Sequence, residues 1–238
     1  MTLRFAFLLL EEHPWGRALL AALIERGYEP ELIIQEISDV ADEERAKFLA
    51  RMAGQPMPPR VVEQARERIT PVWYVNSHNS DFCGELLAAD PPDLLVLGGT
   101  RIIRETILDI PRIATINAHP ALLPTLRGSS SVGWALQKDL PIGATTHYVD
   151  THIDEGDLIL RRELAVQRGD TYETINARLA ALAGELMAET LGYFERGAVP
   201  RAPQERAEGE TLPVISEELL AEGKRRLAQG TYSHFAQM

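Results

Sequence analysis

The sequence predicts an α/β protein with a Rossmann-like, mostly parallel sheet and helices on both faces. An apolar run of strand length at residues 3–10 is followed by a helical pattern over 15–26 and a second strand pattern over 31–37. Strand–helix–strand order is typical of parallel sheets. A further apolar run over 93–98 has the length and composition of a strand buried on both faces. The 238 residues, 45% of them hydrophobic, suffice for one domain with a sizeable core.

The first half of the chain alternates strands and helices. Pro14 suits the first turn of the first helix, in which Trp15, Leu19 and Leu23 recur at helical spacing, and Gly27 ends it. The Gly and Pro content of residues 54–60 indicates a loop. Further helices are expected over 41–53, 60–69, 80–89 and 102–108, and further strands over 72–75 and 113–117.

The second half has a different order of elements. Asp170 is placed to cap a long amphipathic helix over 171–196, and Gly197 to end it. We expect a main domain over 1–197 and an extension over 198–238. The other expected elements are a helix over 129–138, strands over 142–150 and 158–166 joined by a turn with Gly156, an extended linker over 198–213 and a final helix over 217–229.

Charge and cysteine usage narrow the function classes. The formal net charge of −11 argues against a nucleic-acid partner, because such surfaces need clustered Lys and Arg. Cys83 is the single cysteine, which excludes an internal disulfide and favours a reducing compartment. The apolar run at 3–10 is too short to span a membrane and lacks the flanks of a signal peptide. We therefore expect a cytoplasmic protein that does not bind membranes.

Three polar residues are candidates for chemistry. Asn117 and His119 follow a buried strand, where ligands of open α/β sheets bind, and Asp154 lies in a Gly-containing turn. Taken singly, each has a structural explanation: a satisfied histidine, a loop-capping asparagine and an Asx-turn aspartate. Only their combination favours a functional interpretation.

Two linked stretches resemble the motifs of the folate-dependent formyltransferases. The first is Asn117-Ala118-His119-Pro120-Ala121-Leu122-Leu123-Pro124 with Arg127-Gly128, and the second runs from His147 to Asp150 and from Ile153 to Leu160. The resemblance covers about residues 93–192. It implies the formyltransferase fold, a catalytic domain over 1–197 and 10-formyltetrahydrofolate as the formyl donor.

The resemblance also implies catalytic roles. An amine attacks the formyl carbon, and Asn117 and a protonated His119 donate hydrogen bonds to the developing oxyanion. Asp154 would hold the imidazole of His119 and favour its charged form. His119 could relay the proton from the amine towards the folate nitrogen.

The same resemblance implies a folate site built from two loops. Local patterns alone allow simpler explanations, a tight turn for Gly98-Gly99 and a solvated charge for Arg101. Exposed backbone groups of both loops would match the donors and acceptors of the pterin. The expected folate-binding residues are Gly99, Thr100, Arg101 and Ile103 in one loop, and Thr151, His152 and Ile153 in the other.

Arg127, Gly128 and His147 are candidates for contacts with the acceptor substrate. Ser129 to Ser131 are more simply explained as helix caps. His147 is explained equally well as a core histidine. The histidines and aspartates of this region match no metal-ligand spacing, so we expect no metal.

Differences from known family members narrow the choice of acceptor substrate. Leu10 to Gly16 lacks the Gly-rich phosphate loop of the purine-synthesis transformylases. The short extension and negative charge disfavour tRNA. By elimination we expect a primary amine on a small molecule, above all a nucleotide-linked amino sugar.

Several alternatives remain open. They are a methionyl-tRNA formyltransferase-like activity, a formyltetrahydrofolate hydrolase and a non-catalytic folate-binding protein. A Rossmann-type oxidoreductase is discounted, because no G-x-G-x-x-G follows the first strand. The final helix would cover the cleft or pack in a homodimer.

Overall fold

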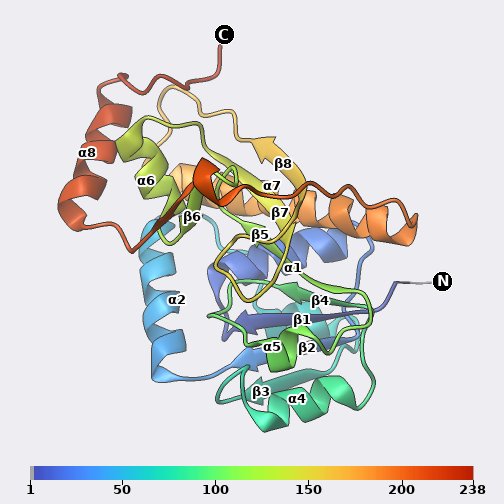
Figure 1. Cartoon of the computed structure of the whole chain (residues 1–238). Helices are drawn as coiled ribbons and strands as arrows, with labels where there is room; N and C mark the ends of the chain where they lie inside the picture. The colour runs from blue at the N-terminus through green and yellow to red at the C-terminus, as the bar shows by residue number, and fades with distance from the viewer. Residues whose placement is uncertain (1–2, 238) are drawn as a thin grey trace.

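The computed structural model describes residues 3–237 and has one large sheet at its centre (Figure 1). Within these residues the sheet has seven strands in the order β3-β2-β1-β4-β5-β7-β8. The first five are parallel, and β7 and β8 are antiparallel additions at one edge. This confirms the predicted fold class. The strands are β1 (Phe5–Leu10), β2 (Leu32–Glu36), β3 (Val72–Val75), β4 (Leu94–Leu97), β5 (Ala114–His119), β7 (Gly143–Tyr148) and β8 (Leu158–Glu163).

Two hydrophobic clusters lie on opposite faces of the sheet. The sequence of strand β1 is continuously apolar because both of its faces are buried. Phe7 and Leu9 belong to the larger cluster, and Ala6 and Leu8 belong to the other. Helices α1 (Pro14–Glu25) and α7 (Tyr172–Glu195) pack together against the larger cluster, whereas α4 (Asp81–Ala88) and α5 (Glu105–Leu108) contribute to the smaller one. Both faces of the parallel strands are therefore shielded from water.

Close packing of α1 on α7 depends on a glycine. A side chain at Gly184 would place its Cβ 2.5 Å from the Cβ of Ala22. Helix α7 also contacts β5, β7 and β8, so it covers one face of the antiparallel edge. The opposite face of that edge carries the candidate site.

The predicted elements agree with the structure to within about three residues, and the main difference lies in the linker. Strand β5 continues to His119, two residues beyond the predicted end. The expected linker 198–213 contains a 3₁₀ turn, η1 (Arg206–Glu208), and a strand, β9 (Glu210–Leu212), which pairs in parallel with β6 (Leu126–Gly128). The other helices are α2 (Asp39–Arg51), α3 (Val61–Arg66), α6 (Ser131–Lys138) and α8 (Glu217–Ala228).

Residues 198–212, which we call the strap, return across the sheet after α7. Figure 1 shows them in orange and red, running from the end of α7 past β7 and β6 towards α8. Helix α8 then packs on α6. Among residues 3–237, no helix combines the length and apolarity needed to cross a bilayer.

Candidate active site

Strand β5 places the first candidate residues on one face of the sheet. Side chains alternate along a strand, so Thr115, Asn117 and His119 point the same way. The antiparallel neighbour β7 sets His147 opposite Asn117. The site therefore begins as a row of polar side chains on the face of the antiparallel edge that α7 leaves uncovered.

The structure brings His119 and Asp154 together. Nδ1 of His119 lies 3.4 Å from Oδ2 of Asp154, and Nε2 lies 3.1 Å from the carbonyl oxygen of Leu126. The His119 residue is 4% exposed, so these groups rather than water surround its ring. Both ring nitrogens thus face acceptors, and a ring protonated at both positions could donate to each.

Asp154 is held as an ionised carboxylate. Its backbone is in the left-handed region, with φ of 54°, and the N–H of Gly128 donates to Oδ2 at 2.9 Å. Burial alone would raise the pKa of Asp154. The neighbouring His119 ring, the Gly128 N–H and Arg127 outweigh it, so the pKa of the carboxyl is lowered.

A hydrogen bond between Asn117 and His147 orients the Asn117 amide. Nδ1 of His147 donates to the carbonyl of Tyr148 at 2.8 Å, which leaves Nε2 as the acceptor for the Nδ2 of Asn117 at 3.2 Å. Burial lowers the pKa of His147 to about 4, so the ring is neutral near pH 7. Nε2 also lies 3.7 Å from Asp154, but an unprotonated nitrogen cannot form an ion pair there. One N–H of the Asn117 amide stays available for a ligand.

Arg127 and Gly128 face the strap. Arg127 is 2% exposed, and its Nη2 lies 3.3 Å from both Oε1 of Gln204 and the carbonyl oxygen of Glu205. Gly128 has φ of +85°, and a Cβ there would lie 2.4 Å from the carbonyl oxygen of Leu212. Arg127 and Gly128, which were expected to contact the acceptor substrate, therefore both contact the strap.

The side chain of Asn79, which was not among the candidate residues, fixes the first predicted folate loop through two hydrogen bonds. Asn79 donates to the carbonyl of Ile102 at 2.9 Å and accepts from the N–H of Arg104 at 2.7 Å. Ile103 is buried in the smaller cluster, and Ile102 is 69% exposed. Gly99, with φ of +83°, packs against His13.

The second predicted folate loop is exposed. Thr151 and His152 face solvent, and the N–H of His152 donates to Asp150 Oδ1 at 2.8 Å in an Asx turn. Ile153 is 46% exposed. Each predicted folate loop therefore exposes an apolar side chain to solvent.

A cavity of about 530 Å³ adjoins this second loop. Thr115, Val149 and Asp150 contribute to its wall, together with Arg201 of the strap. Thr115 lies two residues before Asn117 on the same strand face, although Asn117, His119 and Asp154 do not themselves line the cavity.

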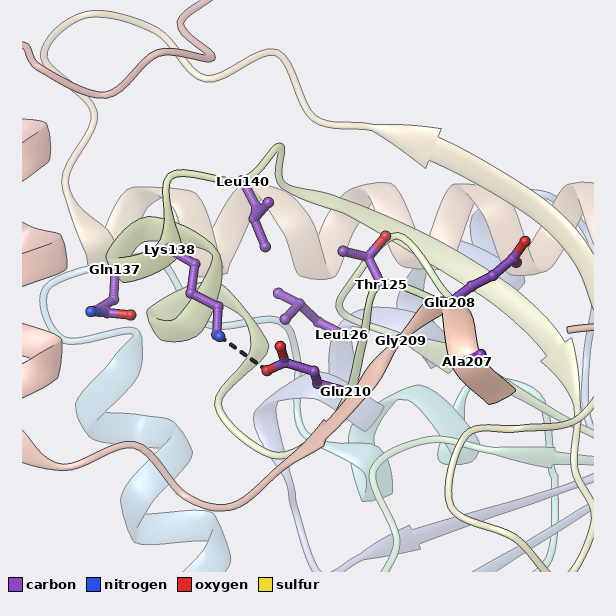
Figure 2. A pocket seen from close by; sticks show the side chains of 9 residues that line it. All are labelled: Thr125, Leu126, Gln137, Lys138, Leu140, Ala207, Glu208, Gly209 and Glu210. Carbon is purple, nitrogen blue, oxygen red and sulfur yellow. Dashed lines mark ion pairs between the residues drawn. The ribbon is translucent and has the colours of Figure 1, made fainter. Parts of the chain in front are cut away.

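A second cavity of about 590 Å³ lies between α6, β6 and the strap (Figure 2). It is lined by Leu126, whose carbonyl faces His119, and is bordered by an ion pair of 3.0 Å between Lys138 and Glu210. Neither His119 nor Asp154 lines it. In the part of the chain that the structure describes, no three His, Cys, Asp or Glu side chains gather to hold a metal ion.

Comparisons with known proteins agree with this architecture. The family model described as formyl transferase matches residues 3–191. A methionyl-tRNA formyltransferase of Koribacter versatilis (strain Ellin345) is 36% identical over 142 residues, which cover 59% of this chain and 46% of that protein. The chain spans about half the length of several curated relatives that it matches.

Solved structures support the fold. A 4-N formyltransferase from Francisella tularensis superposes with a TM-score of 0.63 at 18% identity, covering 94% of this chain and 87% of that one. The formyltransferase PseJ from Anoxybacillus kamchatkensis, in complex with UDP-4,6-dideoxy-4-formamido-L-AltNAc and tetrahydrofolate, gives 0.55 at 21% identity, with 88% and 85% covered. The family match over most of the chain confirms the resemblance seen in the sequence motifs: the chain belongs to the formyl transferase family.

Proposed function

We propose that this chain transfers a formyl group from 10-formyltetrahydrofolate to a primary amine of a small molecule, favouring a nucleotide-linked amino sugar. One observation carries the proposal. Asn117, His119 and Asp154 converge at the end of β5, with an ionised carboxylate 3.4 Å from the imidazole. This is the arrangement that acyl transfer through an oxyanion requires.

Asn117 and His119 have separate roles in the reaction. The amine attacks the formyl carbon, a new C–N bond forms, and the carbonyl oxygen becomes an oxyanion to which the free N–H of Asn117 donates. His119 exchanges the Leu126 carbonyl for this oxyanion when substrate binds, because catalytic hydrogen bonds often tighten only in the complex. Removing one such donor typically costs roughly 3–4 kcal/mol of barrier.

Proton transfer completes the step. The attacking amine loses a proton, the bond between the formyl carbon and N10 of the folate breaks, and N10 gains a proton. The His119 imidazolium gives one proton to N10 and then takes up the proton that the amine nitrogen releases, so the ring ends in its starting state. Asp154 stabilises the imidazolium while the proton is on the ring.

For the donor, we assign the pterin to the cavity beside Val149 and Asp150. Thr115 in its wall lies two residues before Asn117 on the same strand face. The exposed side chains of Ile102 and Ile153 would cover apolar faces of the folate. Tetrahydrofolate bound to PseJ makes this donor class reasonable for a chain of the same fold.

For the acceptor, the net charge of −11 favours a small molecule over tRNA. PseJ, which was solved with a UDP-linked formamido sugar, is matched over 85% of its own length. Formylation of methionyl-tRNA is the second candidate, because the curated relatives with 36% and 34% identity carry that name. Hydrolysis to formate and folate binding without turnover remain as outcomes of the test.

The test measures tetrahydrofolate release from 10-formyltetrahydrofolate with no acceptor, with the amine precursor of the PseJ product, and with methionyl-tRNA. Release that depends on the sugar amine supports the proposal, and release only with tRNA or only with water overturns the acceptor assignment. Asp154→Asn should abolish transfer. Asp170→Asn is the matched control, since Asp170 is a similarly buried carboxylate that pairs with Arg178 away from the site.

A further inference from the structure

The side chain of Gln204, in the strap, reaches the turn that carries Asp154. Its Nε2 lies 3.0 Å from the carbonyl oxygen of Asp154 and 2.6 Å from that of Gly156. The amide therefore donates to both ends of the turn that carries the carboxylate. Its Oε1 accepts from Arg127, which also donates to the carbonyl of Glu205.

The turn needs such support. Asp154 is a non-glycine residue with positive φ, a conformation that is uncommon for side-chain-bearing residues and persists where the surroundings hold it. Gly156 sits so close to Tyr148 that a Cβ would lie 1.9 Å from its carbonyl oxygen. The carboxylate can face His119 only while this tight turn keeps its shape.

The strap also supports the other side of His119. Strand β9 pairs with β6, and the N–H of Glu210 donates to Thr125, next to the Leu126 carbonyl that faces Nε2 of the ring. Gly209 permits the close approach, because a Cβ there would lie 1.6 Å from the carbonyl oxygen of Pro124. Figure 2 shows Gly209 and Glu210 running beside Thr125 and Leu126.

The start of the strap is fixed as well. Ala202 and Leu158 exchange backbone hydrogen bonds of 2.8 and 3.0 Å, and Arg201 pairs with Asp157 at 2.5 Å. The strap is therefore held in place both before and after Gln204, which keeps this side chain beside the turn. The strap begins beyond residue 191, where the family match ends.

We propose that Gln204 is a positioning residue for the His119–Asp154 pair, and that the strap is a working part of the active site of this chain. The inference rests on the formyl-transfer function proposed above. Gln204 acts through the backbone of the turn and touches no reacting atom. Its loss should slow the chemical step more than it weakens donor binding.

Three substitutions separate the contacts of Gln204. Gln204→Glu keeps the length and the oxygen that accepts from Arg127, but removes the N–H groups that reach Asp154 and Gly156. Gln204→Met removes both sets of contacts. Gln204→Asn is the mildest change and is too short to reach both carbonyls. Gln167→Glu is the matched control, because its Nε2 also faces a backbone carbonyl, that of Ala165, on an exposed loop.

The kinetic arm uses the full chain with 10-formyltetrahydrofolate and the acceptor that gives turnover. We expect kcat to fall roughly ten- to hundredfold in Gln204→Glu and Gln204→Met, with the KM for the donor within about twofold, since small misplacements of catalytic groups have effects of this size. Gln167→Glu should behave as wild type. A wild-type kcat in Gln204→Glu overturns the inference. So does a variant in which only the KM for the donor rises or only the melting temperature falls.

The second arm does not depend on turnover. NMR of chains labelled with ¹⁵N-histidine follows the ring nitrogens of His119 at a fixed pH. Gln204→Asn and Gln204→Met should shift the ¹⁵N resonances of the His119 ring, and Gln167→Glu should leave them unchanged. Unaltered His119 resonances in the Gln204 variants refute the positioning role, whereas a wild-type chain without any transfer activity refutes only the proposed function.

Discussion

Two buried histidines should make the fold sensitive to acid. Burial lowers the pKa of His147 to about 4 and that of His13 to about 3, from an ordinary value of 6.5. In both cases the unfolded chain binds a proton at a higher pH than the folded chain does. Stability therefore falls as pH drops below about 6.5, and the loss is complete only below the folded-state pKa values.

The size of the effect follows from the shifts. One pKa unit corresponds to about 1.4 kcal/mol, so at pH 5 each histidine should have lost roughly 2 kcal/mol relative to pH 7.5. Together they would remove about 4 kcal/mol, a large part of the 5–15 kcal/mol typical of a folded domain. Asp154 adds to the loss only at lower pH, because the pKa of its carboxyl is lowered.

Urea unfolding at pH 7.5 and pH 5 measures this directly. His13→Gln and His147→Gln should each be less stable at pH 7.5, yet each should lose roughly 2 kcal/mol less than wild type on going to pH 5. His152→Gln, at an exposed ring, is the control and should keep the wild-type pH dependence. If all three variants lose as much stability as the wild type between the two pH values, the assignment of His13 and His147 as buried neutral groups is wrong.

Further predictions concern the turn, the cysteine and the donor loop. Gly156→Ala should destabilise the fold by roughly 1–3 kcal/mol in urea unfolding, because its Cβ would overlap the carbonyl oxygen of Tyr148; an unchanged midpoint would contradict the turn geometry. Burial raises the pKa of Cys83 to about 12, so iodoacetamide at pH 8 should label it only after unfolding, and rapid labelling of the native chain would contradict its burial. Ile102→Ser should raise the KM for 10-formyltetrahydrofolate severalfold with little change in kcat, and an unchanged KM would remove Ile102 from the donor site.

The sequence was informative where local patterns determine structure. The continuous apolar runs of β1 and β4 and the helical spacing in α1 predicted the parallel sheet, since these strands are buried on both faces. Asn117 and His119 follow from their place at the end of β5. The proximity of Asp154 to His119 was reached through the family resemblance, and the structure has the two side chains in contact.

Other features depend on contacts between distant segments. Strands β6 and β9 have three residues each, too few for a periodic pattern, and form only because they pair with one another. Gln204 and Asn79 are ordinary polar residues in loops, and only the folded chain shows which carbonyls they meet. The burial of Arg127 likewise follows from the path of the strap.

A crystal structure with 10-formyl-5,8-dideazafolate, in the absence of an acceptor amine, would show whether Asn117 and His119 bind the formyl oxygen. We expect this oxygen within about 3 Å of Asn117 Nδ2 and of a ring nitrogen of His119, with Asp154 still beside the other ring nitrogen. A formyl group bound away from these two side chains, or a ligand outside the cavity beside Val149, would contradict the proposal.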